Sequence, residues 1–250
     1  MKQSDRDRSV RLLWESPAEP TRGPKAALSR SRVVEAAMKL ADAEGLDALT
    51  MRRVAETLGN TAMSLYRHVP GKDELLDLMF DTAWGETEPT PKVPWREGLD
   101  FFARQLWGMY RAHPWVVQLG ATRRMPGPEA MTRADAALAV VADLGLLPEE
   151  MQAVVTTVGQ FVDGVGRSMA ERVKVERETG VSEEAWWSGM DSLWEQFTPD
   201  RLPMMTHVYL AGGYDRPLDE FEFGLARVLD GLAVFIESEE RPLVRRETCQ

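Results

Sequence analysis

Residues 45–76 read GLDALTMRRVAETLGNTAMSLYRHVPGKDELL, and this stretch decides the fold. Thr50 stands just before an apolar series of helical spacing, where its hydroxyl can accept a hydrogen bond from a free amide of the first turn. Residues 59–61, Gly-Asn-Thr, interrupt that helix. Residues 62–68 can then form two more turns, until the residue before Pro70 is forced out of the α region. The stretch predicts two short helices joined by a tight turn.

A further amphipathic helix is predicted immediately upstream. Its apolar residues keep helical spacing from Val33 to Ala41, and Gly45 follows Glu44, where a left-handed cap is favourable. Helices this short bury too little surface alone, so the three must share a core. We expect that core to contain Leu49, Val54, Leu58, Leu65, Tyr66 and Val69.

The face that this core leaves free carries hydrogen-bond donors. They are Arg52, Thr61, Ser64, Arg67, His68 and Lys72. Such groups bind phosphate oxygens or base edges, and the amino end of a short helix adds free amides and a positive dipole end. This combination is typical of a helix-turn-helix DNA-binding unit. The spacing alone fits equally well a solvated helical hairpin with ordinary surface charge.

Three runs in this region, residues 26–37, 45–59 and 64–76, resemble the amino-terminal domain of the tetracycline-repressor (TetR) family. The resemblance implies an all-α regulator whose third helix enters the major groove of double-stranded DNA. It implies base or phosphate contacts from Arg52, Thr61, Ala62, Met63, Ser64, Tyr66, Arg67 and His68, and phosphate contacts from Thr50 and Lys72. Asn60 departs from the family, which usually has a small apolar residue in the turn, and it could cap the third helix.

The charge of the chain is unevenly distributed. The net charge is −10, yet residues 22–73 carry nine lysines and arginines against six acidic residues, a net charge of +3, which leaves −13 for the remainder. Basic character therefore gathers where DNA binding is predicted. The single cysteine, Cys249, excludes an internal disulfide and argues against a cysteine-ligated metal. With no signal-like or membrane-spanning apolar segment, we expect a cytoplasmic protein without a membrane partner.

The remaining chain is predicted to be helical throughout, so the fold class is all-α. The expected helices are 72–85, 95–112, 114–121, 128–144, 149–178, 200–210 and 218–237. We expect four regions: a mobile arm (1–27), a helix-turn-helix domain (28–73, with a linking helix to 85), a larger helical domain for ligand binding and dimerisation (86–240), and a tail (241–250). Arg22, Lys25 and Arg30 could contact DNA or belong to a solvated tail.

The last predicted helix has a heptad pattern of apolar residues, with Gly224 and Gly231 beside it. Together with a long helix before it, this pattern predicts a four-helix interface between two chains. The alternative is that the apolar faces of both helices line the core of one chain. Residues 221–232 resemble the closing dimerisation helix of the tetracycline-repressor class. The expected interface residues are Val158, Val162, Val165, Phe221, Leu225, Val228, Leu232 and Phe235.

Aromatic residues interleaved with polar ones suggest a ligand site in the larger domain, although most of the aromatic residues must also serve as core. The expected ligand-binding residues are Trp84, Phe102, Leu106, Trp107, Trp115, Gln118, Gln160, Asp163 and Arg167. The resemblance places Gln118 and Gln160 where tetracycline repressors hold metal-binding histidines. Amides are poor transition-metal ligands, so we expect no metal and no other cofactor. The acceptors and carboxylates favour an apolar, partly cationic or hydrogen-bonding small molecule.

These features predict a homodimeric repressor that binds a palindromic operator and is released by a small-molecule effector. The alternative is a helical small-molecule binder with a non-functional helix-turn-helix. The sequence has only three histidines and shows no nucleophile elbow, no glycine-rich phosphate loop and no paired metal-ligand motif. We therefore do not expect an enzyme.

Overall fold

The computed structural model describes residues 3–15, 28–120, 124–215 and 218–238. Every regular element in these ranges is a helix, which confirms the all-α class. None of the helices there is both long and apolar enough to cross a membrane. The elements are α1 (Gln3–Trp14), α2 (Arg30–Glu44), the 3₁₀ turn η1 (Leu46–Ala48), α3 (Met51–Thr57), α4 (Ala62–Leu65), α5 (Lys72–Gly85), α6 (Trp95–Ala112), α7 (Trp115–Gly120), α8 (Pro128–Ala139), α9 (Pro148–Thr179), α10 (Glu183–Ser188), α11 (Asp191–Trp194), α12 (Pro203–Leu210) and α13 (Glu220–Glu237).

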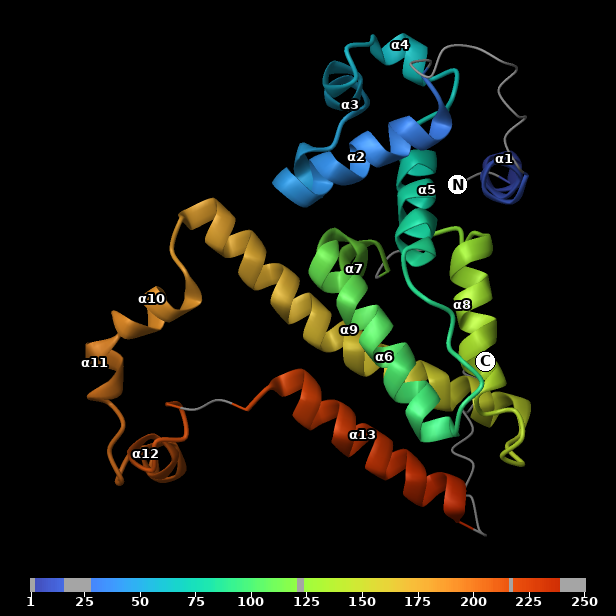
Figure 1. Cartoon of the computed structure of the whole chain (residues 1–250). Coiled ribbons are helices and arrows are strands. Elements are labelled where there is room, and N and C mark those ends of the chain that lie inside the picture. Colours follow the sequence, from blue (N-terminus) through green and yellow to red (C-terminus); the bar gives the residue numbers. More distant parts are fainter. Residues whose placement is uncertain (1–2, 16–27, 121–123, 216–217, 239–250) are drawn as a thin grey trace.

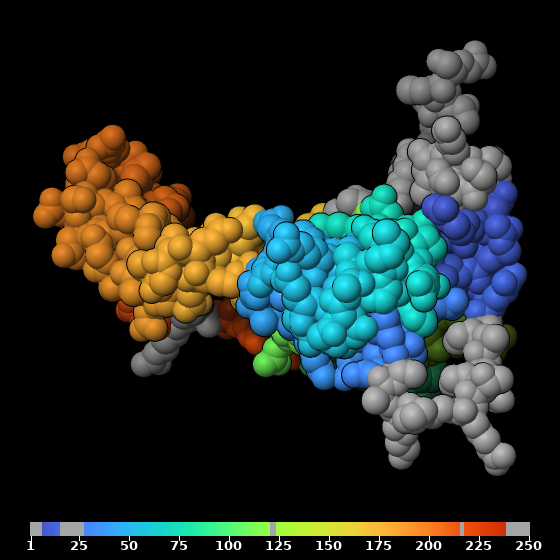
Figure 2. Space-filling model, turned by 90° about the horizontal axis from the view of Figure 1, so that it is seen from above, coloured from blue at the N-terminus to red at the C-terminus, as the bar shows by residue number. Residues whose placement is uncertain are grey.

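The helices form a small unit at one end, a larger body, and a lobe at the side (Figure 1). Helix α2 packs against α3 and α5, α3 packs against α4, and α5 continues down to α8. In the body, α9 packs against α6 and α13. Helices α10, α11 and α12 lie away from the body, beyond the carboxyl end of α9, and form a protruding lobe (Figure 2).

The small unit begins its helices where the sequence predicts them. Ser29 caps α2, and Thr50 caps α3 by accepting a 3.2 Å hydrogen bond from the amide of Arg53. Gly45 ends α2 with φ +84°, a value that favours glycine. Asn60 does not cap α4, because Thr61 holds that position and the Asn60 amide donates to the Leu58 carbonyl.

The predicted core of this unit is confirmed with one exception. Leu49, Val54, Leu65 and Val69 are fully buried, and Leu58 is partly buried against them. Tyr66 is 45% exposed, so its assignment to the core is wrong. The reason is that α4 ends at Leu65, and the turn that follows directs Tyr66 outward.

The mobile arm predicted for residues 1–27 is wrong for its first half. Gln3–Trp14 forms α1, which packs along α5. An ion pair of 2.7 Å joins Arg8 to Glu74, and Ser9 is buried. The sequence hid this helix because its apolar residues gather at its carboxyl end rather than repeating along one face. The second half of the predicted arm, with Arg22 and Lys25, lies outside the described residues, as does the tail at 241–250.

Two more contacts fix α1. The Arg30 guanidinium donates to the Leu12 carbonyl at 2.8 Å, and the Trp14 indole donates to the Pro126 carbonyl at 3.2 Å. Arg30, a candidate for DNA contact, therefore holds α1 onto the start of α2.

Helices α5 and α6 match the predicted bounds at both ends, and α9 extends the prediction by one residue at each end. Helix α8 ends at Ala139, before the predicted residue 144, and α10 and α11 were not predicted. Helix α8 is also held at its start by a side chain of α5. Asp81 accepts hydrogen bonds from the amides of Ala130, at 3.0 Å, and Glu129, at 3.4 Å.

Replacing this carboxylate tests how firmly α5 holds α8. We expect Asp81→Ala to lower the free energy of unfolding by about 1–3 kcal/mol, because two buried amides lose their acceptor. Asp81→Asn keeps one acceptor oxygen and should cost less. Urea denaturation followed by circular dichroism measures both, and an unchanged midpoint for Asp81→Ala would contradict the capping role.

Candidate DNA-binding face and ligand cavity

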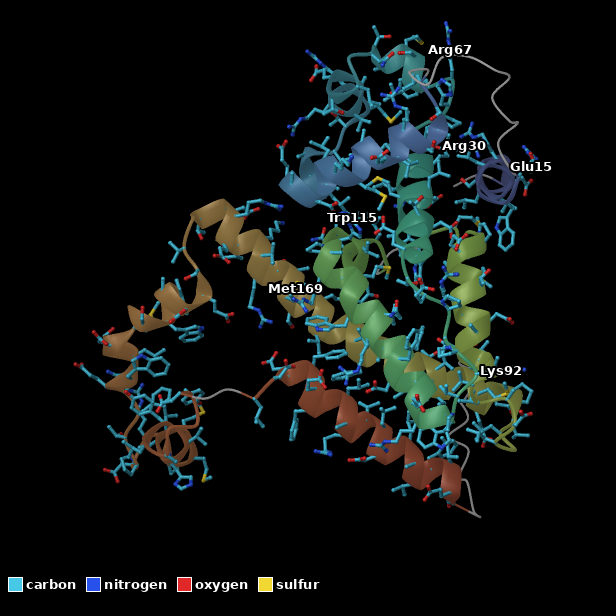
Figure 3. All side chains as sticks on the ribbon, viewed as in Figure 1. Glu15, Arg30, Arg67, Lys92, Trp115 and Met169 are labelled. Carbon is cyan, nitrogen blue, oxygen red and sulfur yellow. The ribbon has the colours of Figure 1, made fainter. Side chains whose placement is uncertain are left out.

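The residues predicted to contact DNA lie on α3, on α4 and its following turn, and at the start of α5, at the end of the molecule remote from the body. Figure 3 shows Arg67 at this outer edge. Thr50, Arg52, Thr61, Met63, Tyr66, Arg67 and Lys72 are exposed, and Ala62, Ser64 and His68 are half-buried. The structure therefore brings the predicted set together on one accessible face.

The cationic side chains of this face are free to contact a phosphate or only weakly paired. Arg52 pairs with Glu56 at 2.8 Å, but both side chains are largely exposed, and such a surface pair is weak enough to be exchanged for a phosphate. Arg53, its neighbour, instead pairs with Glu44 at 2.6 Å and supports the turn beneath. In the described part of the chain, neither Arg67 nor Lys72 forms an ion pair.

Most of the predicted ligand-binding residues pack in the core or form hydrogen bonds within the chain. Phe102 and Leu106 are buried core residues, and Trp107 stacks on Phe221 with ring centroids 5.1 Å apart. Trp84 packs in the core, where its buried indole N–H has no hydrogen-bond partner among the described residues. Trp115 is buried and donates to Asp42 at 2.6 Å. None of these five side chains lines the cavity between α7, the carboxyl half of α9 and α10, so their assignment to a ligand site stays a prediction.

Asp163 and Gln160 also lie away from the cavity between α7, the carboxyl half of α9 and α10. The Tyr110 hydroxyl donates to Asp163 at 2.6 Å, and burial, then the Asp163 charge, raises the pKa of Tyr110 well above its usual range. Asp163 is thereby engaged within the body. Gln160 is exposed on α9 and does not line the cavity.

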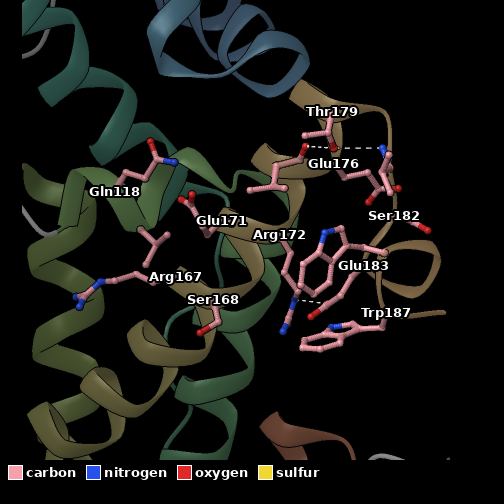
Figure 4. A pocket seen from close by; sticks show the side chains of 15 residues that line it. Gln118, Arg167, Ser168, Glu171, Arg172, Glu176, Thr179, Ser182, Glu183 and Trp187 are labelled. Carbon is pink, nitrogen blue, oxygen red and sulfur yellow. Dashed lines mark hydrogen bonds and ion pairs between the residues drawn. The ribbon is translucent and has the colours of Figure 1, made fainter. Parts of the chain in front are cut away.

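The cavity lies between α7, the carboxyl half of α9, and α10, and its volume is about 980 Å³ (Figure 4). Of the predicted ligand residues, it brings together Gln118 and Arg167. The remaining lining comes from Val117, Ser168, Ala170, Glu171, Arg172, Val175, Glu176, Thr179, Val181, Ser182, Glu183, Trp186 and Trp187.

Sequence reasoning missed Trp186 and Trp187. They pack edge to face, with centroids 4.6 Å apart, on the short helix α10. A signal was available, because Ser182 caps α10 by accepting from the amide of Ala185, and a capping serine before two tryptophans marks a helix. The pair stays substantially exposed, with Trp186 at 50% and Trp187 at 41%.

The charges around the cavity are only partly paired. Arg172 lies 3.4 Å from Glu183, and Arg167 lies 3.7 Å from Asp163. Within the described residues, Glu171 and Glu176 form no ion pair. The cavity thus combines apolar walls and indole rings with three carboxylates and two guanidinium groups.

The predicted dimer residues face mainly into their own chain. Val158, Val162, Phe221 and Leu225 are buried within the monomer, so they offer no surface to a second chain, and their assignment is corrected. A side chain at Gly224 would clash with Phe161 of the same chain. The remaining members, Val165, Val228, Leu232 and Phe235, are half-buried against the same core.

A helix-turn-helix unit with an exposed basic face, joined by one linking helix to a helical body that contains a cavity, defines a DNA-binding regulator with a sensor domain. The chain matches the family model for bacterial regulatory proteins of the tetR family over residues 33–79. It matches the tetracycline-repressor-like C-terminal domain over residues 88–236. The chain belongs to the tetracycline-repressor (TetR) family of transcriptional regulators.

Characterised relatives and structures agree with this assignment. The chain is 39% identical to the HTH-type transcriptional repressor DrrR1 of Streptomyces coeruleorubidus, over 92% of this chain and 86% of the relative. It is 29% identical to the class A tetracycline repressor of Escherichia coli, over 82% and 91% of the two chains. The structure of Streptomyces coelicolor ActR in complex with actinorhodin superposes with a TM-score of 0.70, at 30% identity, over 84% of this chain and 97% of that chain.

Proposed function

We propose that this regulator is a homodimeric repressor that holds a palindromic operator through α3, α4 and the start of α5. A small molecule in the cavity between α7, α9 and α10 releases the DNA. The observation that carries this proposal is that α7 and α9 line the cavity and also touch the DNA-binding unit. Trp115 of α7 donates to Asp42 of α2, and Lys174 of α9 lies 3.7 Å from Asp47 of η1.

The cavity favours an aromatic cation as effector. Trp186 and Trp187 provide π faces, which attract cations as well as rings. The lining carries three carboxylates, Glu171, Glu176 and Glu183, against two guanidinium groups, Arg167 and Arg172, so a cationic ligand would offset the excess negative charge while its rings bury the apolar wall. Support for ligand binding in this fold comes from ActR, whose structure has been solved in complex with actinorhodin.

The proposed dimer surface is the outward face of α13. Phe223 and Val234 are 52% and 73% exposed there, and a side chain at Gly231 between them would meet no other atom within 4 Å. Arg227 and Asp230 form an ion pair of 2.7 Å on the same face. An exposed stripe with a glycine at its centre allows close approach of a second α13 across a two-fold axis.

DNA binding is tested by substitutions on the exposed face. We expect Arg52→Ala and Tyr66→Ala to weaken operator binding by about tenfold or more, because each removes a proposed contact of roughly 1–3 kcal/mol. Arg52→Ala should also reduce the salt dependence of binding. Fluorescence anisotropy with operator DNA at several salt concentrations measures both. Lys39→Ala is the matched control, since Lys39 lies on α2 and pairs with Glu35. Parent-like affinity in both variants would contradict the proposed contacts.

The dimer surface is tested by placing a charge on the outward face of α13 in one variant and on its buried face in another. We expect Val234→Glu to dissociate the dimer while the helix content stays unchanged, because the new carboxylate would be buried only in the interface. Leu225→Glu should instead unfold the chain, because Leu225 is buried within the monomer. Sedimentation velocity and circular dichroism distinguish the two. A dimeric Val234→Glu variant would move the interface away from this face.

The cavity is tested with two probes of equal shape and opposite charge, tetraphenylphosphonium and tetraphenylborate. We expect the cation to bind at least tenfold more tightly and to release the operator. Trp187→Ala should weaken its binding, and the double variant Glu171→Gln/Glu176→Gln should reduce the preference for the cation. Calorimetry measures binding, and Trp14→Ala, on α1, is the control. Equal binding of both probes would contradict the cationic effector, and binding without operator release would contradict control through this cavity.

A further inference from the structure

His113 stands at a junction of three elements. It is the C-cap of α6 and comes two residues before α7. Its Nδ1 lies 2.7 Å from the Asp42 carboxylate of α2, and its Nε2 lies 2.7 Å from the carboxylate of Glu86, the residue that caps α5. The imidazole is only 12% exposed. One ring therefore joins the first helix of the DNA-binding unit, the end of the linking helix and the body.

This geometry selects the charged form of histidine. A neutral imidazole donates one hydrogen bond and presents a lone pair on its other nitrogen, whereas the imidazolium donates from both. Between two carboxylates, the neutral ring would set that lone pair against an anion. Burial by itself lowers the pKa of His113, but the hydrogen bonds to Asp42 and Glu86, with their charges, outweigh burial and raise the pKa above its ordinary value.

Other charged groups near this junction do not replace His113. On the α9 side, Lys174 and Arg177 line a small crevice with Asp42, but Lys174 pairs with Asp47 and Arg177 lies against Gly45. On the α2 side, His113 lines a cavity that also carries Arg30, Lys39, Arg67 and His68. Arg30 donates to the Leu12 carbonyl and Lys39 pairs with Glu35. Trp115 also donates to Asp42, and its hydrogen bond does not depend on the pH.

We propose that doubly protonated His113 is the positioning residue that fixes the DNA-binding unit on the body, and that loss of its proton above neutral pH loosens this contact and weakens operator binding. The reason for the weaker binding is pre-organisation. Two DNA-binding units held at a fixed spacing lose less freedom on an operator than two units that are loosely attached.

The direction in which operator affinity changes with pH follows from the raised pKa of His113. A group whose pKa is higher in the folded protein contributes its full stabilisation below the unfolded value, which is about 6.5 for histidine. That contribution is lost as the pH rises through the raised pKa. Operator affinity should therefore be highest below about pH 6.5 and should fall on the alkaline side.

The protonation is measured directly by NMR, since the chain has only three histidines, His68, His113 and His207. We expect the His113 ring signal to titrate above the ordinary histidine pKa in the parent protein. Glu86→Gln should shift this titration to lower pH, and Asp42→Asn should do so while keeping an acceptor for Trp115. A His113 signal that titrates normally in the parent, or that neither substitution moves, would overturn the proposal.

The effect on function is measured as operator affinity between pH 6 and pH 9 for the parent and His113→Gln. At pH 6 we expect the parent to bind the operator about tenfold more tightly than His113→Gln does, which is the effect of one charged hydrogen bond. By pH 9 we expect the operator affinities of the two proteins to converge. His207 is present in both proteins, whereas His68 lines the same cavity as His113, so the comparison is repeated with His68→Gln in both proteins. A constant difference at all pH values would show a purely structural role, and no difference would remove His113 from DNA control. Glu86→Gln repeats the test at a 53% exposed carboxylate, where misfolding is not expected.

Discussion

The structure depends on one face of α5, where three carboxylates are buried. Glu74, Asp77 and Asp81 follow each other at helical spacing, and burial raises the pKa values of the last two, although nearby hydrogen bonds oppose this effect. A buried carboxylate is tolerated only with partners. Arg8 of α1 supplies one, Arg124 supplies the second at 3.4 Å, and the amino end of α8 supplies the third. The helix that links the two domains is thereby held along its length.

Local signals were sufficient to predict most of the fold. Gly71 and Pro94 precede α5 and α6, and those two helices have the predicted bounds. The three-helix unit followed from Thr50, Gly45 and its apolar spacing, because caps and breakers act within a few residues. Helix α1 could not be predicted in this way, since an ion pair to Glu74 and contacts to α5 stabilise it from a distance in the sequence.

The DNA-binding face was easier to predict than the ligand cavity, because one short segment carries it. The cavity is built from α7, α9 and α10, whose proximity depends on how the chain folds back. The apolar periodicity of α13 also could not show which of its faces packs against its own chain and which faces outward. Phe221 and Leu225 pack against their own chain, while Phe223 and Val234 face outward, and a heptad pattern is the same in both cases.

Two of the contacts between the DNA-binding unit and the body belong to the two walls of the cavity. Helix α7 carries Gln118 on the cavity and, at its start, contacts Asp42 of α2. Helix α9 carries Glu171 on the cavity and, about one turn further, contacts Asp47 of η1. Under the proposed function, a ligand that changes the separation of α7 and α9 would therefore displace these supports relative to each other. Because α5 is held by its buried carboxylates, we expect the unit to respond by tilting, which in the proposed dimer would change the spacing of the two recognition helices on an operator.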